Sequence, residues 1–293
     1  MPLKGEILSY PLAPLTSWHI GGVAERFFSA THVEALGQYI AALPETTPLT
    51  WLGLGSNVLI REAGIKGAVL GTRQLLELTQ LKEGTVFAQA GVTCAKLARF
   101  SSRLGFPDAA FFAGIPGTVG GALAMNAGAF GGETWPWVKR VQMINRQGEI
   151  FYREPSEFKV GYRSVKGMQE SQSNEAFVGA VFEFPFYEDS NGLQKIKELL
   201  RKRAQSQPIG TLNCGSVYRN PPNDFAARLI EACGLKGFQV GDAMVSPKHA
   251  NFIINSGQAC AQDVETIMST IEKHVFEQFG ISLQAEVKIL GER

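Results

Sequence analysis

Apolar side chains recur along the chain at two spacings, and these predict a succession of helices and strands. Residues 33–43 have apolar positions at helical spacing, and Pro44 and Pro48 follow as stop signals. We predict further helices over residues 94–105, 193–208 and 263–279, with a short one after Asp224. The helix over 263–279 would bury a stripe made of Val264, Ile267, Met268, Ile271 and Val275.

Runs of β-prone and alternating residues predict the strands. They cover residues 25–30, 49–53, 85–91 and 177–186. Residues 138–154 alternate around Gln147-Gly148, which is typical of an antiparallel hairpin. Residues 283–290 also alternate, and this pattern alone places Glu286 on the solvent face, opposite Leu283, Ala285, Val287 and Ile289.

The segment 111–133, FFAGIPGTVGGALAMNAGAFGGE, is too rich in glycine for an ordinary helix. Each glycine in a helix costs roughly 1 kcal/mol relative to alanine, and Pro116 removes a backbone donor as well. We predict a loop wrapped around a large flat ligand or its phosphates. A run of tight turns under crowded packing is the alternative.

A second glycine turn, GLGSNVLI at 53–60, follows the predicted strand 49–53. Its backbone amides could form an anion-binding concavity suited to a pyrophosphate, or the turn could be a simple hairpin. It is not a dinucleotide fingerprint, because a third glycine and an immediate helix are missing. A third turn, NCGSVYRNPP at 213–222, carries Ser216, and a serine in such a turn is more often structural than catalytic. No GxSxG motif indicates hydrolysis.

Composition narrows the function classes. With 293 residues, 45% hydrophobic and 19% charged, the chain can form about two domains. Lys and Arg total 28 against 27 Asp and Glu, so the net charge of the chain does not favour nucleic acid or an anionic membrane as partner.

No leader or membrane-length apolar run is visible, and we expect a cytoplasmic protein. His19 and the scattered cysteines suggest no metal site, and we expect four reduced thiols at Cys94, Cys214, Cys233 and Cys260.

The motif GIPGTVGGALAMNAGA resembles the flavin-binding segment of the UDP-N-acetylenolpyruvoylglucosamine reductases, also called UDP-N-acetylmuramate dehydrogenases. The resemblance runs in unbroken order from IGG near residue 20 to EVKILG at the end, through CGSVYRNP, LKGFQVG and KHANFIIN. Asp108 and Ala110 depart from the glycine and glutamate usual in the family. The segment before Leu193 is too short for a tyrosine-bearing capping loop, so the chain resembles the shorter, second type, and Tyr187 cannot be given that loop's role.

The resemblance implies an α+β fold. A two-subdomain FAD-binding region of the vanillyl-alcohol-oxidase/PCMH type would occupy residues 1–195, with subdomains of about 1–72 and 73–195. A smaller α+β substrate-binding domain would follow at 196–293, and its C-terminal strand would bring Glu286 to the active site.

The resemblance also implies a chemistry. NADPH would reduce noncovalently bound FAD, and the hydride would then pass to the enolpyruvyl ether of UDP-N-acetylglucosamine to give UDP-N-acetylmuramate. Arg163, a surface cation by pattern alone, and Glu286 would stabilise an enol-like intermediate, and Ser216 would protonate it. A related flavin oxidase and a noncatalytic nucleotide-sugar sensor remain alternatives.

The implied contacts fall in two sets. The implied FAD contacts are Gly53, Gly55, Ser56, Asn57, Gly114, Ile115, Pro116, Gly117, Thr118, Gly120, Gly121, Asn126, Ala127 and Gly128. The implied substrate contacts are Tyr162, Arg219, Asn220, Lys236, Gln239, Lys248, His249 and Asn251.

Overall fold

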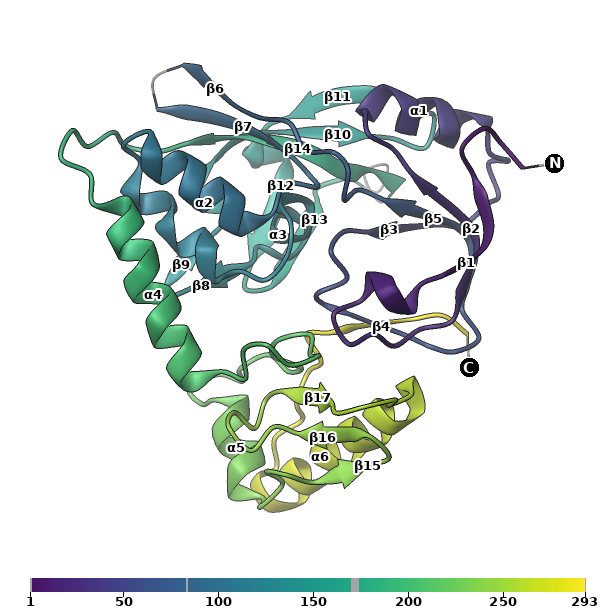
Figure 1. The fold of residues 1–293 in the computed structure, drawn as a ribbon, viewed down its shortest axis with the longest axis vertical. Helices are drawn as coiled ribbons and strands as arrows, with labels where there is room; N and C mark the ends of the chain where they lie inside the picture. The colour runs from purple at the N-terminus through teal and green to yellow at the C-terminus, as the bar shows by residue number, and fades with distance from the viewer. Residues whose placement is uncertain (1, 83, 170–173, 293) are drawn as a thin grey trace. The chain divides into compact units, whose positions relative to one another are not determined.

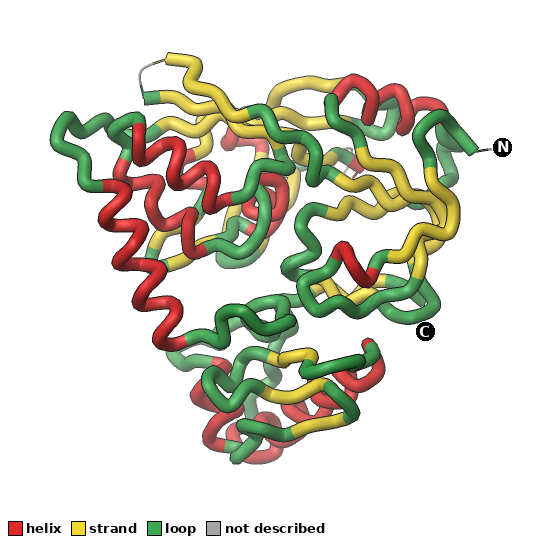
Figure 2. The backbone as a smooth tube through the Cα atoms, in the orientation of Figure 1, coloured by secondary structure: helices red, strands yellow, loops and turns green. Residues whose placement is uncertain are grey.

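The computed structural model describes residues 2–82, 84–169 and 174–292. Helices and mostly antiparallel strands are interleaved along the chain (Figures 1 and 2), which confirms the α+β class. Contacts divide the chain into two compact units. The larger unit comprises residues 1–7, 27–54 and 68–203, and the smaller unit comprises 8–26, 55–67 and 204–293. The predicted domain boundary at 195/196 stays a prediction, and the smaller unit draws on two N-terminal segments in addition to the C-terminal one.

A five-stranded antiparallel sheet in the order β11-β10-β14-β7-β6 forms the centre of the larger unit. Its strands are β6 (Leu78–Lys82), β7 (Thr85–Gln89), β10 (Val138–Ile144), β11 (Ile150–Arg153) and β14 (Ala176–Glu183). Every residue of β7 is buried, the apolar Val86, Phe87 and Ala88 as well as the polar Thr85 and Gln89. The predicted hairpin at 138–154 is confirmed, since Ile144 faces Ile150 across the turn.

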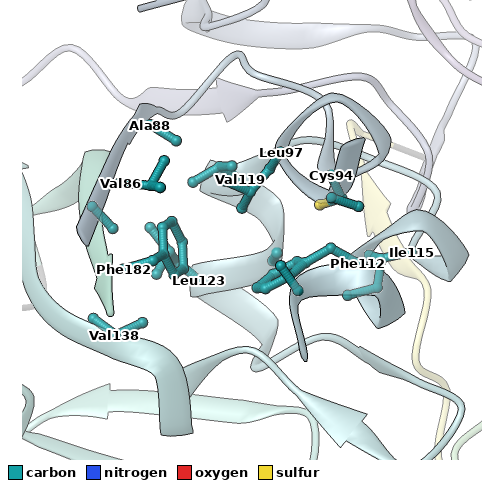
Figure 3. Close-up of a cluster of buried hydrophobic side chains, with 14 of the residues drawn as sticks. Val86, Ala88, Cys94, Leu97, Phe112, Ile115, Val119, Leu123, Val138 and Phe182 are labelled. Atoms are coloured by element: carbon teal, nitrogen blue, oxygen red, sulfur yellow. The ribbon is translucent and has the colours of Figure 1, made fainter. Parts of the chain in front are cut away.

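Helix α2 (Cys94–Arg103) and the 3-10 helix η2 (Pro107–Gly114) pack with this sheet around an aromatic core. Thr93 begins α2 by accepting a hydrogen bond from the Lys96 amide at 3.2 Å. Figure 3 shows part of the core, where Val86 and Phe182 of the sheet approach Leu123. Of the two departures from the family pattern, Asp108 pairs with Lys195 at 3.6 Å and Ala110 is fully buried.

The glycine-rich segment contains a helix, so the prediction of a loop throughout is wrong. Helix α3 (Val119–Met125) begins after Thr118 and ends at Asn126, which takes the left-handed conformation at φ 42°. Tertiary packing overrides the glycine penalty, because Val119, Ala122 and Leu123 point into the core. A Cβ at Gly120 would lie 2.9 Å from Ala90 Cβ, so glycine permits this close packing.

Helix α1 (Val33–Ala42) packs with β3 (Leu49–Leu52) and the parallel β5 (Ile65–Gly71) around a second core in the larger unit. The turn between β10 and β11 meets this helix closely. A Cβ at Gly37 would lie 2.4 Å from the Gly148 carbonyl oxygen. Arg146 donates to the carbonyls of Ile40, at 3.2 Å, and Pro44, at 2.5 Å, at the end of the helix.

In the smaller unit, helix α6 (Ala261–Phe279) covers one face of a three-stranded antiparallel sheet (Figure 1). This sheet consists of β15 (Gln239–Val240), β16 (Ala243–Val245) and β17 (Ile253–Asn255). The short helix α5 (Ala226–Ala232) packs against α6. The predicted buried stripe is confirmed in full, since Val264, Ile267, Met268, Ile271 and Val275 are all buried.

The predicted C-terminal strand is shorter than its alternating pattern. Strand β18 (Lys288–Leu290) pairs in parallel with β4 (Val58–Ile60), whereas Ala285 makes only an isolated bridge with Tyr218. Ala285 is also exposed, so the predicted common face of residues 283–289 is wrong at that position.

A four-stranded sheet in the order β1-β2-β5-β3 and several short strands and helices complete the fold. The remaining elements are β1 (Ile7–Pro11), η1 (Ala13–Leu15), β2 (Val23–Ser29), β8 (Gly128–Ala129), β9 (Gly132–Glu133), η3 (Trp135–Trp137), η4 (Pro155–Glu157), β12 (Phe158–Gly161), β13 (Ser164–Gly167) and α4 (Gly192–Ser206).

None of the helices in the described part of the chain is long and apolar enough to cross a membrane. All four cysteines lie in that part and are free thiols. Cys94 and Cys214 are buried, and Cys233 and Cys260 are partly exposed.

Candidate active site

The β12–β13 hairpin carries Arg163 at its tip, in an uncommon backbone conformation. Gly161 faces Ser164 across the hairpin, which leaves Tyr162 and Arg163 to form the turn. Arg163 has φ 52°, in the left-handed region that costs a non-glycine residue roughly 1–2 kcal/mol. Its guanidinium carbon lies 5.2 Å from the centre of the Tyr162 ring. Such strain persists only where surrounding contacts hold it.

Two carbonyl groups of the glycine-rich segment hold the Arg163 guanidinium. Its Nη1 donates to the Asn126 oxygen at 3.3 Å, and its Nη2 donates to the Gly128 oxygen at 3.2 Å. The side-chain Nδ2 of the buried Asn126 in turn donates to the Glu133 carboxylate at 2.9 Å and to the Gly161 carbonyl at 3.3 Å. Three predicted site residues, Asn126, Gly128 and Arg163, therefore lie together in the larger unit.

The second part of the GLGSN turn belongs to the smaller unit and lies next to Glu286. Gly55 has φ 67°, and a Cβ there would fall 2.1 Å from the Leu15 carbonyl oxygen, so no other residue fits. Asn57 donates its side-chain Nδ2 to the Glu286 carbonyl at 3.1 Å. The Asn57 carbonyl accepts from the Lys288 amide at 3.0 Å. Both bonds tie this turn to the segment that carries Glu286.

Ser216 and Glu286 lie on two segments that pair through their main chains. The Val217 carbonyl accepts from the Glu286 amide at 2.7 Å, and the Arg219 amide donates to the Gln284 carbonyl at 2.9 Å. Both Ser216 and Glu286 are half-buried. A hydroxyl and a carboxylate from positions 70 residues apart in sequence are thus carried by neighbouring segments.

Cys214 fixes the start of the Ser216 segment. Its buried thiol lies 3.4 Å from the Val58 carbonyl oxygen and 3.7 Å from that of Gly55, as a weak donor. Burial raises the pKa of Cys214 to about 12, so the thiol stays protonated. Gly215 follows at φ 74°, and its amide donates to the Asn213 side chain at 2.9 Å. The tight turn predicted around Gly215 is present.

Comparison with known proteins gives the family. The family profile of the UDP-N-acetylenolpyruvoylglucosamine reductase C-terminal domain matches residues 207–290, and that of an FAD binding domain matches residues 24–152. UDP-N-acetylenolpyruvoylglucosamine reductase of Coxiella burnetii is 50% identical over 99% of this chain and 97% of its own length. The protein of that name from Methylococcus capsulatus is 50% identical over 99% of this chain and 95% of its own. The chain belongs to the UDP-N-acetylenolpyruvoylglucosamine reductase family.

A solved member of the family has the same fold. UDP-N-acetylenolpyruvylglucosamine reductase from Thermus caldophilus is 29% identical, with a TM-score of 0.81 and 98% of both chains covered. The resemblance drawn from the sequence motifs is confirmed, as are the predicted fold class and the assignment to an FAD-dependent class of oxidoreductases.

The larger unit of this reductase family member offers a fit for FAD at the start of α3. Thr118 is 2% exposed, and its Oγ1 makes no hydrogen bond within the described residues. A buried hydroxyl without a partner is costly, and an acceptor group of a ligand would satisfy it. A Cβ at Gly53 would lie 2.9 Å from that Oγ1, whereas a Cβ at Gly121 would meet nothing within 4 Å. Gly53 therefore permits the close approach of Thr118, whereas Gly121, which is exposed, leaves open space beside the start of α3.

Other glycines of the segment serve packing instead of leaving space. A Cβ at Gly114 would lie 2.3 Å from the Phe130 ring, and Gly120 packs on Ala90 as described above. The alternative of crowded packing therefore holds at these two positions, although their cofactor contacts stay predictions. Of the other residues predicted to contact FAD, Pro116 is exposed, Ile115 is buried, and the half-buried ones are Ser56, Gly117 and Ala127.

Several predicted substrate residues already bind groups of the smaller unit. Lys236 pairs with Glu231 at 2.7 Å, and Lys248 donates to the Ala204 carbonyl at 2.6 Å. Gln239 donates to the carbonyl of the nearby Gly241 at 2.8 Å. Their contact with a nucleotide sugar remains a prediction. An incoming anion would have to compete with these partners.

Of the other predicted substrate residues, Tyr162 lies in the β12–β13 turn of the larger unit, and Arg219, Asn220, His249 and Asn251 lie in the smaller unit. The Asn220 side chain accepts from the Ala226 amide at 3.1 Å, at the start of α5. His249 stacks edge-on with Phe252 at 4.7 Å between ring centres, and burial lowers the pKa of its imidazole. Its Nδ1 accepts from the Asn251 amide at 3.3 Å, so the neutral ring fits this position.

Sequence reasoning missed two residues, Arg73 and Glu133, that hold the predicted FAD-binding segments in place. Arg73 donates from Nε to the Gly53 carbonyl at 3.1 Å and from Nη2 to the Leu54 carbonyl at 2.8 Å. Glu133 holds the Asn126 amide as described above. No local motif marks either residue, because Arg73 binds carbonyls 19 and 20 residues away and Glu133 binds a side chain seven residues away.

Proposed function

We propose that this chain catalyses the NADPH-dependent reduction of UDP-N-acetylglucosamine enolpyruvate to UDP-N-acetylmuramate, with noncovalently bound FAD. The reaction is a step of peptidoglycan precursor synthesis, in the cytoplasm. FAD, when bound, supplies hydride transfer from the nicotinamide to the terminal vinyl carbon of the substrate. NADPH thus provides the two electrons, and the second hydrogen comes as a proton from the protein.

The side chains of this chain have three tasks in the reaction. Hydride addition places negative charge on the neighbouring carbon and its carboxylate, and the Arg163 guanidinium stabilises that charge. Protonated Glu286 donates a hydrogen bond to the same enol-like group. The Ser216 hydroxyl then gives its proton to the carbon. A hydroxyl is a weak acid, but the carbanionic centre is a strong base, so correct placement suffices.

One observation carries this proposal. The Glu286 amide donates to the Val217 carbonyl at 2.7 Å, so the hydroxyl of Ser216 and the Glu286 carboxylate are carried by paired segments. The chain that contains these segments is 50% identical to two relatives named UDP-N-acetylenolpyruvoylglucosamine reductase. Two features of the larger unit support the same conclusion: two carbonyls hold the Arg163 guanidinium, and the Thr118 hydroxyl has no hydrogen-bond partner in the described part of the chain.

The test follows the visible spectrum of the purified, FAD-loaded protein without oxygen. We expect NADPH to bleach the flavin absorbance, and UDP-N-acetylglucosamine enolpyruvate to restore it in stoichiometric amount. Acid precipitation should release the colour into the supernatant. Recovery only with oxygen, or colour that stays with the precipitate, would favour the flavin oxidase. Binding of the nucleotide sugar without consumption of NADPH would favour the sensor.

A further inference from the structure

We propose that Asn251 is a positioning residue that fixes the Ser216 segment against the Glu286 segment, instead of a contact to the nucleotide sugar. The inference rests on the proposed function, because it assigns a part in the protonation step. Asn251 is 3% exposed. Its Oδ1 accepts from the Tyr218 amide at 2.9 Å, and its Nδ2 donates to the Tyr218 carbonyl at 2.8 Å. The side chain thus pairs with both polar main-chain groups of one residue.

The Asn251 side chain replaces a neighbouring strand at this position. A carboxamide carries one donor face and one acceptor face, so it can pair with a residue as another main chain would. The Asn251 carbonyl adds a third bond by accepting from the Val217 amide at 2.9 Å. One edge of the segment 217–219 is therefore held by a single asparagine.

The opposite edge of the same segment holds Glu286. The Val217 carbonyl accepts from the amides of Glu286, at 2.7 Å, and Val287, at 3.4 Å. Because Val217 is bonded on both edges, a displacement on the Asn251 side shifts the residue that directly follows Ser216 and the main chain of Glu286 together. The proton donor and the carboxylate depend on this one arrangement.

Asn251 itself sits in a rigid turn. The fully buried Ser246 hydroxyl accepts from the amides of Lys248, at 3.2 Å, and His249, at 3.3 Å. The Ser246 amide donates to the Phe252 carbonyl at 2.8 Å. Tyr218 is anchored as well, since its buried hydroxyl donates to the Met268 carbonyl of α6 at 2.9 Å. Asn251 therefore connects two fixed points with little freedom to turn toward a ligand.

The test uses the FAD-loaded full chain with Asn251→Ala, which removes both side-chain bonds to Tyr218. Flavin reduction by NADPH should be unchanged, because no proton donor acts in that step. Flavin reoxidation by saturating UDP-N-acetylglucosamine enolpyruvate should slow roughly 100-fold, the cost of a misplaced catalytic group. The Kd of that substrate should stay at the parent value. A raised Kd with an unchanged rate at saturation would instead make Asn251 a substrate contact and overturn the proposal.

Asn255→Ala is the matched control. Asn255 is as buried as Asn251, at 5% exposure, and its side chain donates to the Trp18 carbonyl at 2.8 Å and accepts from the Gly257 amide at 3.0 Å. Neither of these two side-chain bonds of Asn255 involves residues 217–219. We expect a lowered unfolding temperature but parental rates in both steps. An equal slowing of flavin reoxidation in this control would assign the effect to general destabilisation and overturn the proposal.

Amide hydrogen exchange tests the same set of main-chain hydrogen bonds without turnover of the substrate. In the parent protein the amides of Val217, Tyr218 and Glu286 should exchange slowly, and in Asn251→Ala they should exchange faster. Asn251→Asp, which keeps an acceptor for the Tyr218 amide, should protect Val217 and Tyr218 better than alanine does. Fast exchange of Tyr218 in the parent would overturn the proposal even if no variant folds. A parent that fails to turn over but shows these protections would contradict the proposed function alone.

Discussion

Individual side chains at the candidate site are held mainly by the main chain around them. Arg163 is held at a positive φ by the carbonyls of Asn126 and Gly128, and Ser216 directly precedes a residue bonded on both edges. Position, set by backbone hydrogen bonds, therefore has to supply most of the reactivity.

Ser216→Ala should separate the two halves of the reaction. The variant should bind FAD and accept electrons from NADPH as the parent does, because the hydroxyl acts only on the substrate. Substrate reduction should slow roughly 100-fold or more, the scale of a lost general acid. Stopped-flow absorbance measures both steps. Near-normal turnover in the variant would remove Ser216 from its proposed part in the reaction.

Arg163→Lys tests whether turnover depends on the two fixed donor nitrogens of the guanidinium as well as on its charge. A lysine keeps the charge but cannot donate to the Asn126 and Gly128 carbonyls from two fixed nitrogens. Turnover should therefore fall in Arg163→Lys, and fall roughly 100-fold in Arg163→Ala, where the stabilising charge is lost. Steady-state rates and circular dichroism are measured together. Parental rates in Arg163→Ala with an unchanged spectrum would contradict the assignment.

At the scale of elements, the pattern of apolar residues predicted those helices and strands that depend mainly on interactions between residues close in sequence. The helix over 261–279 and the hairpin at 138–154 have long or symmetric patterns, and both are present. Helix α3 could not be predicted, because its stability comes from the burial of Val119, Ala122 and Leu123 in a core whose other members are remote in sequence. The pairing of Glu286 with Val217 is equally remote. Family motifs suggested candidate residues for the site, and these stay predictions, but the motifs gave no sign of the main-chain bonds that hold those residues.

Gly120 and Gly121 are neighbours in α3 with opposite surroundings, so the same substitution should have opposite effects. Gly120→Ala would force its Cβ to within 2.9 Å of Ala90 Cβ, and the overpacking should cost about 1–3 kcal/mol, more than the gain in helix propensity. Gly121→Ala meets nothing within 4 Å and should gain up to about 1 kcal/mol in the protein without flavin.

Thermal unfolding of both proteins after flavin removal measures these changes. FAD titration adds a second readout, since a methyl group in the open space at Gly121 should weaken flavin binding. Equal stability changes in the two variants would refute the packing account of Gly120. Unaltered flavin affinity in Gly121→Ala would place the cofactor elsewhere.

At the scale of the whole molecule, each compact unit has its own core and its own buried thiol. Cys94 lies in the core of the larger unit and Cys214 in that of the smaller unit, and burial raises the pKa of each from the ordinary value of 9.0 to about 12. Both thiols are held protonated by desolvation, and neither forms a disulfide. Alkaline pH therefore acts on both units through the same chemistry.

Stability should fall as pH rises above 9. Between pH 9 and 12 the unfolded chain loses the thiol protons while the folded chain keeps them, so the unfolded state binds fewer protons and the unfolding free energy declines with pH. Each cysteine should account for about 1.4 kcal/mol between pH 8 and pH 10, and for almost nothing below pH 8. Urea unfolding at both pH values measures the loss. Cys94→Ala and Cys214→Ala should each have a lower unfolding free energy at pH 8 but a shallower decline toward pH 10 than the parent. A decline as steep as the parent's in both variants would show that other groups cause the alkaline loss.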